Sequence, residues 1–437
     1  MIPSTQMGMS LAENLPGAAA SPARPATWLA SPAPFRLLLI ACVMFNAVLA
    51  VLNGHVAPVS ANMVTAVQGA LMFTALALAI AARPEGMAKW LTMLWLALAG
   101  FALLSLLRGH VELRYLGDLA LIFVFILFGL AMPARAVLSA VPIIQAIVVI
   151  GALWELLDPA GFGGFFRIQQ YYVNSRGFDG DAFWASNPDL FLSSERPTGR
   201  LLLPGTGAHR ASSLFLEPVS LGNWTIVVTL AIAALQPMLS RATILFLLLG
   251  NLFLLFACDG RMALAINLVL LAIWPIAPRL PRWFPALCLP LILVLLLAAS
   301  GFGFLEERGD TLLGRYRYGL DYLLGLDAAG VLGLRATAGV VAADSGWAYF
   351  IVTQSIVGLI AVWLALTIQP AAGSPARRRF VAGMAVFLSL SLPVSYSIFS
   401  IKTAALLWAL FGFLQRKDVS FDRKRNDYEF QSVKAII

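Results

Sequence analysis

The stretch HRASSLFLEPVSLGNWTIVVTLAIAALQ, residues 209–236, decides the fold class of this chain. From Pro218 to Gln236 it carries no charged side chain, and as an α-helix it would be roughly 28 Å long at 1.5 Å per residue. That length matches the hydrocarbon core of a bilayer, which is about 30 Å thick. Two charged residues, Arg210 and Glu217, come just before this segment. Because an unpaired charge beside lipid is costly, both are candidates for a function.

The composition of the whole chain indicates a membrane protein. Of its 437 residues, 60% are hydrophobic and only 12% are charged, and the mean hydropathy is +0.84. These values exclude a soluble globular domain. The formal net charge is +8. We assign it to topology signals in short loops and expect no nucleic-acid partner.

Inside lipid the backbone must hydrogen-bond to itself, and long runs without alternation indicate helices and not a barrel. We therefore predict an all-α polytopic membrane protein with about twelve transmembrane helices and two long extracytoplasmic loops, near 158–215 and 305–343. Eleven helices are the alternative, because the last two apolar runs are short. The predicted spans are 35–53, 62–82, 90–107, 115–132, 136–157, 216–236, 241–258, 261–277, 284–304, 344–369, 380–397 and 399–415.

The short loops indicate the orientation, because Lys and Arg concentrate on the cytoplasmic side of membrane proteins. With the N-terminus inside, every inner connection carries Lys or Arg, and the last one contains three arginines, Arg377–Arg379. We expect residues 1–34 to form a disordered cytoplasmic leader, 35–415 the helical bundle, and 416–437 a basic cytoplasmic tail. The outer loop RGHVELR, residues 108–114, departs from the charge pattern.

Basic residues on the outer side are almost all arginine. The guanidinium group binds phosphate and carboxylate through two parallel hydrogen bonds, so an arginine-rich outer surface beside lipid favours an anionic, lipid-linked substrate. For any single arginine, the alternative is a solvated loop face balanced by Asp and Glu. The thirteen outward basic residues are Arg108, Arg114, Arg167, Arg176, Arg196, Arg200, Arg210, Arg261, Arg308, Arg315, Arg317, Arg335 and Lys402.

Glu217 is the first candidate catalytic residue. Pro218 suits the first position of a helix, and the residue before a proline is biased away from helical geometry. Glu217 is thus expected at the helix N-terminus, where the free N–H groups and the helix dipole favour an ionised carboxylate. It would act as a base or a positioning carboxylate, with Arg210 binding an anion beside it. The alternative is a helix cap next to an anchoring arginine.

Three further charged points fall at the same predicted membrane depth. Arg261 follows the turn residues Asp-Gly and heads an apolar run, on the side where the topology rule disfavours it. Arg315 lies in GRYRYGLDYLLGL, which has the pattern of an amphipathic helix on the membrane surface. Asp344 begins the sequence DSGW at the start of another span, where an N-cap is the ordinary explanation.

Other polar and reactive residues carry weaker signals. The cysteines Cys42, Cys258 and Cys288 lie in or beside apolar runs without disulfide or metal spacing, so we expect no metal site there. The histidines His110 and His209 have the pattern of ordinary loop residues. Asp118 and Lys402 are intramembrane charges that pair, line a cavity, or lie nearer the boundary than the predicted spans suggest.

Taken in order, these motifs resemble those of the Wzy-type polysaccharide polymerases and the related O-antigen ligases. The resemblance covers about 205–365. It consists of an arginine followed by LFLEP, an arginine heading the span after the next hairpin, a Gly-Arg in a long outer loop, and DSGW above the next helix. The absence of a His-Asn motif favours a polymerase, similar to those of xanthan-type exopolysaccharide clusters.

The resemblance implies a glycosyltransferase of the bacterial inner membrane with both termini cytoplasmic. Its substrates would be oligosaccharides linked to undecaprenyl diphosphate, and its partners a chain-length regulator and a flippase of the same pathway. Transfer would need no metal or other cofactor. On this basis Arg210, Arg261 and Arg315 would bind the diphosphate, and Glu217, or else Asp344, would take the proton of the acceptor hydroxyl.

Three other functions fit parts of the sequence. A ligase would transfer a finished glycan to another acceptor with almost the same residues. A flippase or other transporter predicts charges along the bundle midplane and repeated halves, whereas here no internal repeat is visible and the charges gather at the outer rim. A structural subunit of an export complex would not need the rim arginines.

Overall fold

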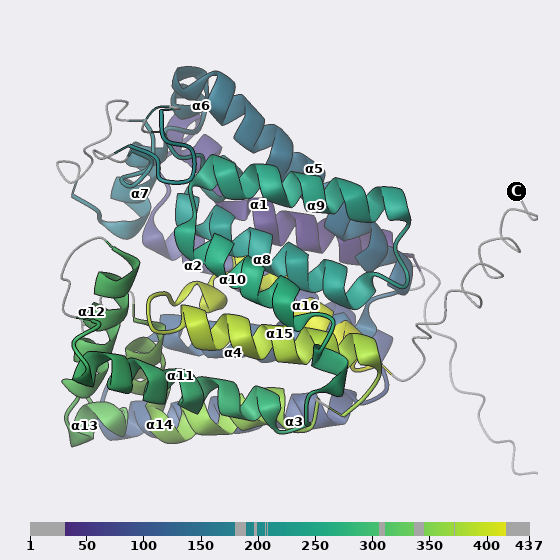
Figure 1. Cartoon of the computed structure of the whole chain (residues 1–437), viewed down its shortest axis with the longest axis vertical. Coiled ribbons are helices and arrows are strands. Elements are labelled where there is room, and N and C mark those ends of the chain that lie inside the picture. The colour runs from purple at the N-terminus through teal and green to yellow at the C-terminus, as the bar shows by residue number, and fades with distance from the viewer. Residues whose placement is uncertain are drawn as a thin grey trace, which may run out of the picture.

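The computed structural model describes residues 31–179, 189–195, 199–205, 207, 209–305, 311–335, 345–370 and 372–416 (Figure 1). Regular secondary structure in these ranges is entirely helical, apart from one isolated β-bridge between Glu195 and His209. Nine of the described helices are long and apolar enough to cross a membrane. The chain is therefore a multi-pass membrane protein, as its composition predicts. The nine are α1 (Ala33–His55), α2 (Ala61–Ala82), α3 (Met87–Arg108), α4 (Leu113–Ala131), α5 (Ala134–Leu157), α8 (Pro218–Leu235), α9 (Arg241–Cys258), α11 (Phe284–Gly301) and α14 (Gly346–Thr367).

Three shorter helices lie in the same bundle: α10 (Arg261–Ile273), α15 (Pro375–Ser391) and α16 (Ile401–Leu414). Helix α16 is buried along its whole length and packs against α1, α4, α8 and α15. A helix enclosed by protein does not need the length of one that faces lipid, since its ends meet other polar groups.

Short helices gather at one end of the bundle, on the left in Figure 1. We call this the loop end; it carries α6 (Pro159–Phe166), α7 (Ile168–Arg176), α12 (Leu312–Leu324) and α13 (Ala328–Val331). These helices belong to the two long loops expected from the sequence. Helix α6 is tied to the end of α1 by His55 Nε2, which lies 2.8 Å from the Phe165 carbonyl, and by Arg167 Nη1, which donates to the Gly54 carbonyl over 2.7 Å.

Two predicted helix starts lie at the loop end. Helix α8 begins at Pro218, and Glu217 has an extended backbone (φ −143°, ψ 123°), which confirms the expectation from Pro218. Helix α14 begins at Gly346, and its N-cap is Ser345, whose side chain accepts a hydrogen bond from the Ala348 amide. Asp344 lies outside the described residues.

Polar side chains within the spans α8, α9 and α10 form hydrogen bonds with one another. Asn251 of α9 donates to the Thr225 carbonyl and to Thr229 Oγ1 over 2.7 and 2.9 Å. Asn267 of α10 donates to Thr225 Oγ1 over 3.1 Å and accepts from Thr229. Such neutral hydrogen bonds hold helices together in an apolar environment. The centre of this three-helix unit is thus polar but uncharged.

Arg108, one of the outward arginines, has a structural role. Helix α14 is interrupted at Ser355, whose φ of 68° and ψ of 163° are not helical. The Arg108 guanidinium donates to the carbonyls of Val352 and Thr353, over 3.0 and 2.8 Å, and also to that of Gly333. The carbonyls left without helical partners at the break are thereby satisfied by a cation, which also suits a helix C-terminus.

The contact between α4 and α16 depends on two glycines and gives the first prediction. A methyl group on Gly412 would clash with the Ile126 carbonyl, and one on Gly129 with the Ala409 carbonyl, whereas Gly69 of α2 has open space around it. Gly412→Ala should destabilise the purified protein by about 1–3 kcal/mol, the usual cost of overpacking. Gly69→Ala should leave the stability unchanged or raise it by up to about 1 kcal/mol, because Ala favours the helix and meets no neighbour there.

Thermal unfolding of both variants in detergent measures this difference. Equal melting temperatures for Gly412→Ala and Gly69→Ala would contradict the close crossing of α4 and α16.

Candidate functional site

The carboxylate of Glu217 is the centre of a group of side chains at the loop end. Its Oε2 atom accepts hydrogen bonds from Lys402 Nζ of α16 and from Ser220 Oγ of α8, both over 2.7 Å. Its Oε1 atom accepts from the Tyr172 hydroxyl of α7 over 2.8 Å and lies 3.0 Å from Arg176 Nη1. The two oxygens therefore meet four partners from three helices. We call these five residues the Glu217 cluster.

The Glu217 cluster runs from the protein surface into its interior. The side chains of Arg176, Glu217 and Lys402 are 40%, 15% and 1% exposed, respectively. The ammonium group of Lys402 also donates to the Phe215 carbonyl over 3.0 Å. A cation this deeply buried is stable only when it is fully paired. Lys402 is thus the buried partner of the carboxylate. Arg176 is the partner at the protein surface.

Glu217 is ionised at neutral pH. Burial by itself would raise the pKa of this carboxyl, but the positive charges of Lys402 and Arg176, with the hydrogen bonds from Lys402 and Ser220, outweigh it. The pKa therefore lies below its ordinary range. Burial and the neighbouring carboxylate raise the pKa of the Tyr172 phenol, so Tyr172 stays a neutral donor. A carboxylate held in this way gains basicity only when one of its cations moves away.

Arg210, from the loop before α8, packs against the turn between α9 and α10. It is buried, and its Nε and Nη1 atoms donate to the carbonyls of Cys258 and Ser193 over 3.0 and 3.1 Å. Asp259, in the left-handed region at φ 49°, accepts from the amides of Leu201 and Leu202 over 3.1 and 2.8 Å. These bonds fix the loop before α8 to the turn that leads into Arg261.

Arg261 is the first residue of α10 and is partly exposed, two residues beyond Asp259. The structure thus brings Arg210 and Arg261, two of the predicted diphosphate ligands, to one turn. Their surroundings differ, since Arg210 supports the turn from inside while Arg261 lies nearer its surface.

Arg315, the third predicted ligand, lies on α12 with an exposed side chain. Helix α12 is held against the last turn of α15 and the segment after it, because the Tyr316 hydroxyl donates to the Leu390 carbonyl over 2.8 Å and Gly319 meets the Pro393 carbonyl. The described contacts place Arg315 at the loop end but do not join it to Arg210, Arg261 or Glu217. Asp344, the alternative base, lies outside the described residues.

Glu155 is a buried carboxylate that the sequence reading missed. It is completely buried near the end of α5 and accepts from the amides of Ser212 and Ser213 over 2.8 and 2.6 Å, and from Ser212 Oγ. His209 Nε2 lies 3.4 Å from its Oε1 atom. Glu155 thereby holds the start of the short helix η3 (Ser213–Phe215), whose last carbonyl meets Lys402. In the sequence, the feature that could have indicated this site is a carboxylate inside an apolar run.

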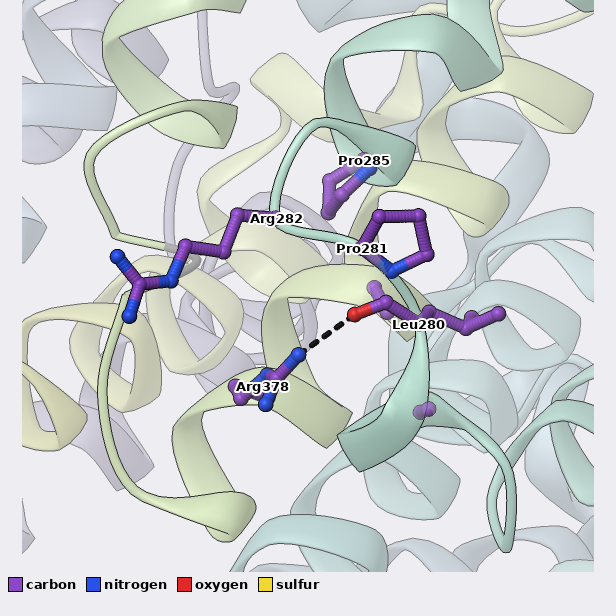
Figure 2. Close-up of a pocket in the computed structure, with 7 residues that line it drawn as sticks. Leu280, Pro281, Arg282, Pro285 and Arg378 are labelled. Atoms are coloured by element: carbon purple, nitrogen blue, oxygen red, sulfur yellow. Dashed lines mark hydrogen bonds between the residues drawn. The ribbon is translucent and has the colours of Figure 1, made fainter.

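A small pocket lies at the opposite end of the bundle, between η4 (Ala277–Arg279), the start of α11 and the start of α15 (Figure 2). Arg378 spans it and donates to the Leu280 carbonyl over 2.5 Å, and Arg282 points away from this bond. This pocket shares no residue with the Glu217 cluster or with the turn that carries Arg261.

In the part of the chain that the structure describes, no group of three His, Cys, Asp or Glu side chains is placed to hold a metal ion. Comparisons of the chain with protein-family models, with curated proteins and with solved structures found no match. The assignment of a function therefore rests on the residues and on their arrangement.

The pairing of Glu217 with Lys402 gives the second prediction. Lys402→Met leaves a largely buried carboxylate without its inner partner and should lower the free energy of unfolding by about 3–5 kcal/mol, whereas replacing both partners should cost less. Thermal unfolding in detergent of Lys402→Met, of Glu217→Gln and of the double variant Glu217→Gln/Lys402→Met measures these effects. A double variant as unstable as the sum of its two single variants would show that the pair is not coupled.

The ionisation of Glu217 gives the third prediction. Because its pKa in the folded protein lies below the ordinary 4.5, the ionised carboxylate stabilises the fold above pH 4.5. This stabilisation is lost as the pH falls from 4.5 toward the lower folded-state value. Melting temperatures between pH 7 and pH 3 should therefore fall more steeply for the wild type than for Glu217→Gln. Parallel curves would contradict the strong pairing of this carboxylate.

Proposed function

We propose that this protein is a glycosyltransferase that polymerises oligosaccharide units carried on undecaprenyl diphosphate, as a polysaccharide polymerase of the bacterial inner membrane does. The observation that carries the proposal is the Glu217 cluster, in which an ionised carboxylate and two cations meet at the end of an apolar bundle. A lipid-linked diphosphate has its charged group at this depth, and its hydrocarbon chain lies in the surrounding lipid.

In the proposed topology, the nine long helices together with α10, α15 and α16 give the twelve spans predicted from the sequence. The loop end then faces outward, and both termini are cytoplasmic. The run Arg377–Arg379 at the start of α15 supports this orientation, since Arg377 and Arg378 bond there to the Leu414 and Leu280 carbonyls at the opposite end. Helices α10 and α16 have 13 and 14 residues, and protein covers the whole of α16.

In the proposed reaction, an acceptor hydroxyl oxygen forms a bond to the anomeric carbon of the donor glycan. The bond from that carbon to the diphosphate oxygen breaks, and its electron pair remains on the departing diphosphate. The charge that develops there is stabilised by Arg261 and Arg315, with Arg210 fixing the turn that presents Arg261. Donors that are already in place favour the transition state over the ground state.

Glu217 takes the hydroxyl proton in this scheme. Its low pKa requires that a cation leave the carboxylate first, and Arg176 is the partner with the exposed side chain. An incoming diphosphate competes for that guanidinium. Asp344 remains the second candidate for this role.

A ligase that transfers the finished glycan to another acceptor would use the same groups, and it differs only in the acceptor. A transporter is less well supported, because the hydrogen-bonded Thr and Asn side chains of α8, α9 and α10 within the spans are neutral.

The fourth prediction tests the reaction. Purified protein in lipid nanodiscs, given an undecaprenyl-diphosphate-linked repeat unit, should produce a ladder of polymer on a gel. Arg261→Ala should slow ladder formation by about 100-fold, as for the loss of one donor to a developing oxyanion. Arg335→Ala is the control, because Arg335 forms an exposed pair with Asp327 in the same half of the molecule.

Melting temperatures of both variants check that they are folded. Equal losses of activity in Arg335→Ala and Arg261→Ala would contradict the assigned role of Arg261. Movement of the lipid-linked unit across the bilayer without any ladder would favour the transporter, and transfer to a different lipid acceptor would favour the ligase.

A further inference from the structure

The pocket at the end of the bundle opposite the Glu217 cluster is basic (Figure 2). It is formed by the segment that joins α10 to α11 and by the first two turns of α15. Its lining is apolar, with Leu280, Pro281 and Pro285 among the contributors, except for the side chains of Arg282 and Arg378. These two arginines come from segments far apart in the sequence, and the proposed reaction uses neither of them.

Both guanidinium groups keep hydrogen-bonding capacity. Arg378 donates from Nη2 to the Leu280 carbonyl, and its Nε and Nη1 atoms have no acceptor among the described residues. Arg282 is exposed and extends away from that bond (Figure 2), and it forms neither a hydrogen bond nor an ion pair in the described ranges. Beside Arg378, the Nε atom of Arg379 is buried without a described acceptor. The pocket therefore offers N–H donors that suit a charged oxygen.

The surrounding helices carry no carboxylate that could neutralise these cations. The helices that pack closely against α15 are α8, α10, α11, α14 and α16. Neither they nor α15 contain Asp or Glu. The tail after the described part of the chain, residues 417–437, has five basic and four acidic side chains, so it is not a net-anionic partner. The positive charge of the pocket is thus left for a ligand from outside the chain.

The direction of the neighbouring helices adds to this positive charge. Helices α11 and α15 both begin at the pocket, so the positive ends of two helix dipoles meet there. Helix α11 begins without a side-chain cap and without an acidic residue in its first turn. An anion at this place is therefore favoured by the backbone as well as by the two arginines.

The pocket adjoins an apolar surface that faces the membrane. Helix α11 is the least buried of the nine long helices. Leu287, Leu291 and Val294 are exposed and lie on one face of it, because they recur at helical spacing. Trp283 is exposed one turn before Leu287, next to Arg282, and tryptophan is typical of the membrane–water interface. A hydrocarbon chain can thus lie along α11 while a charged headgroup reaches the pocket.

We propose that this pocket binds the headgroup phosphate of an anionic phospholipid from the leaflet at this end of the bundle. The phosphate oxygens accept hydrogen bonds from Arg282 and Arg378, and an acyl chain lies along the exposed face of α11. Basic pockets between membrane helices bind anionic headgroups in this way. A zwitterionic headgroup fits less well, because its cationic group would meet arginine and no carboxylate. The proposal goes beyond the proposed function and does not depend on it.

The alternative is that these arginines only set the orientation of the chain in the membrane. Orientation needs basic residues on one side but no shared pocket, so every basic residue at this end would then affect lipid binding alike. Arg241 distinguishes the two explanations. It is exposed at the start of α9, at the same end of the bundle, and does not line the pocket.

The fifth prediction concerns lipid binding. Native mass spectrometry of the purified protein should show tighter binding of dioleoyl phosphatidylglycerol than of dioleoyl phosphatidylcholine, which has the same chains and no net charge. Arg282→Gln should weaken the binding of phosphatidylglycerol by about tenfold, as loss of a charge-assisted hydrogen bond does. Arg282→Lys should weaken it less, because the charge is kept. The control Arg241→Gln removes the same charge at the same end and should bind like the wild type.

Thermal unfolding in detergent gives an independent readout. Added phosphatidylglycerol should raise the melting temperatures of the wild type and of Arg241→Gln more than that of Arg282→Gln, because a ligand of the folded state stabilises it. Melting temperatures without lipid show that the variants are folded.

Three results would overturn the proposal. Equal weakening in Arg282→Gln and Arg241→Gln would assign the effect to the charge of the whole surface. Equal affinity of the wild type for the two lipids would exclude an anionic ligand. Displacement of the lipid by glycerol phosphate, which has the charge without the chains, would assign the pocket to a soluble phosphate.

Discussion

The ion pair between Glu217 and Lys402 is the interaction on which the rest of the structure depends. It joins the N-terminus of α8 to α16, the fully buried helix at the centre of the bundle. Two charges can stay in so apolar a place only if their remaining hydrogen-bonding capacity is met. That requirement places Tyr172 and Arg176 of α7 on one carboxylate oxygen and the Phe215 carbonyl on the ammonium group. Helix α7 and the segment just before α8 are thereby joined to the core.

Beyond this pair, the described polar groups are arranged by depth. Within α8, α9 and α10 the buried Thr and Asn side chains are neutral and bond to one another. At the loop end the charges are instead held by groups far apart in sequence, such as Glu155 with the amides before η3, and Arg210 with the Cys258 carbonyl. A site built in this way is buried at its base, at Lys402, and exposed at Arg176.

Much of the fold could be predicted because local rules act on it. Long apolar runs predicted the helices. Pro218 predicted the start of α8 and, with it, the position of Glu217. The partners of Glu217 could not be predicted in this way, because Lys402 lies 185 residues further along the chain and no local pattern links the two. Arg210 was expected to bind a ligand, whereas its described partners are backbone carbonyls, which side-chain patterns do not reveal. Glu155 was missed because its apolar run reads as an ordinary span.

The central claim is that the cations of the loop end hold a lipid-borne diphosphate beside the Glu217–Lys402 pair. An electron cryo-microscopy map of the protein in nanodiscs with undecaprenyl diphosphate tests it most directly. The account predicts diphosphate density at the loop end within hydrogen-bonding distance of a guanidinium group, with Lys402 still bonded to Glu217. Density confined to the opposite end, near Arg282 and Arg378, or a Glu217 side chain without Lys402, would contradict it.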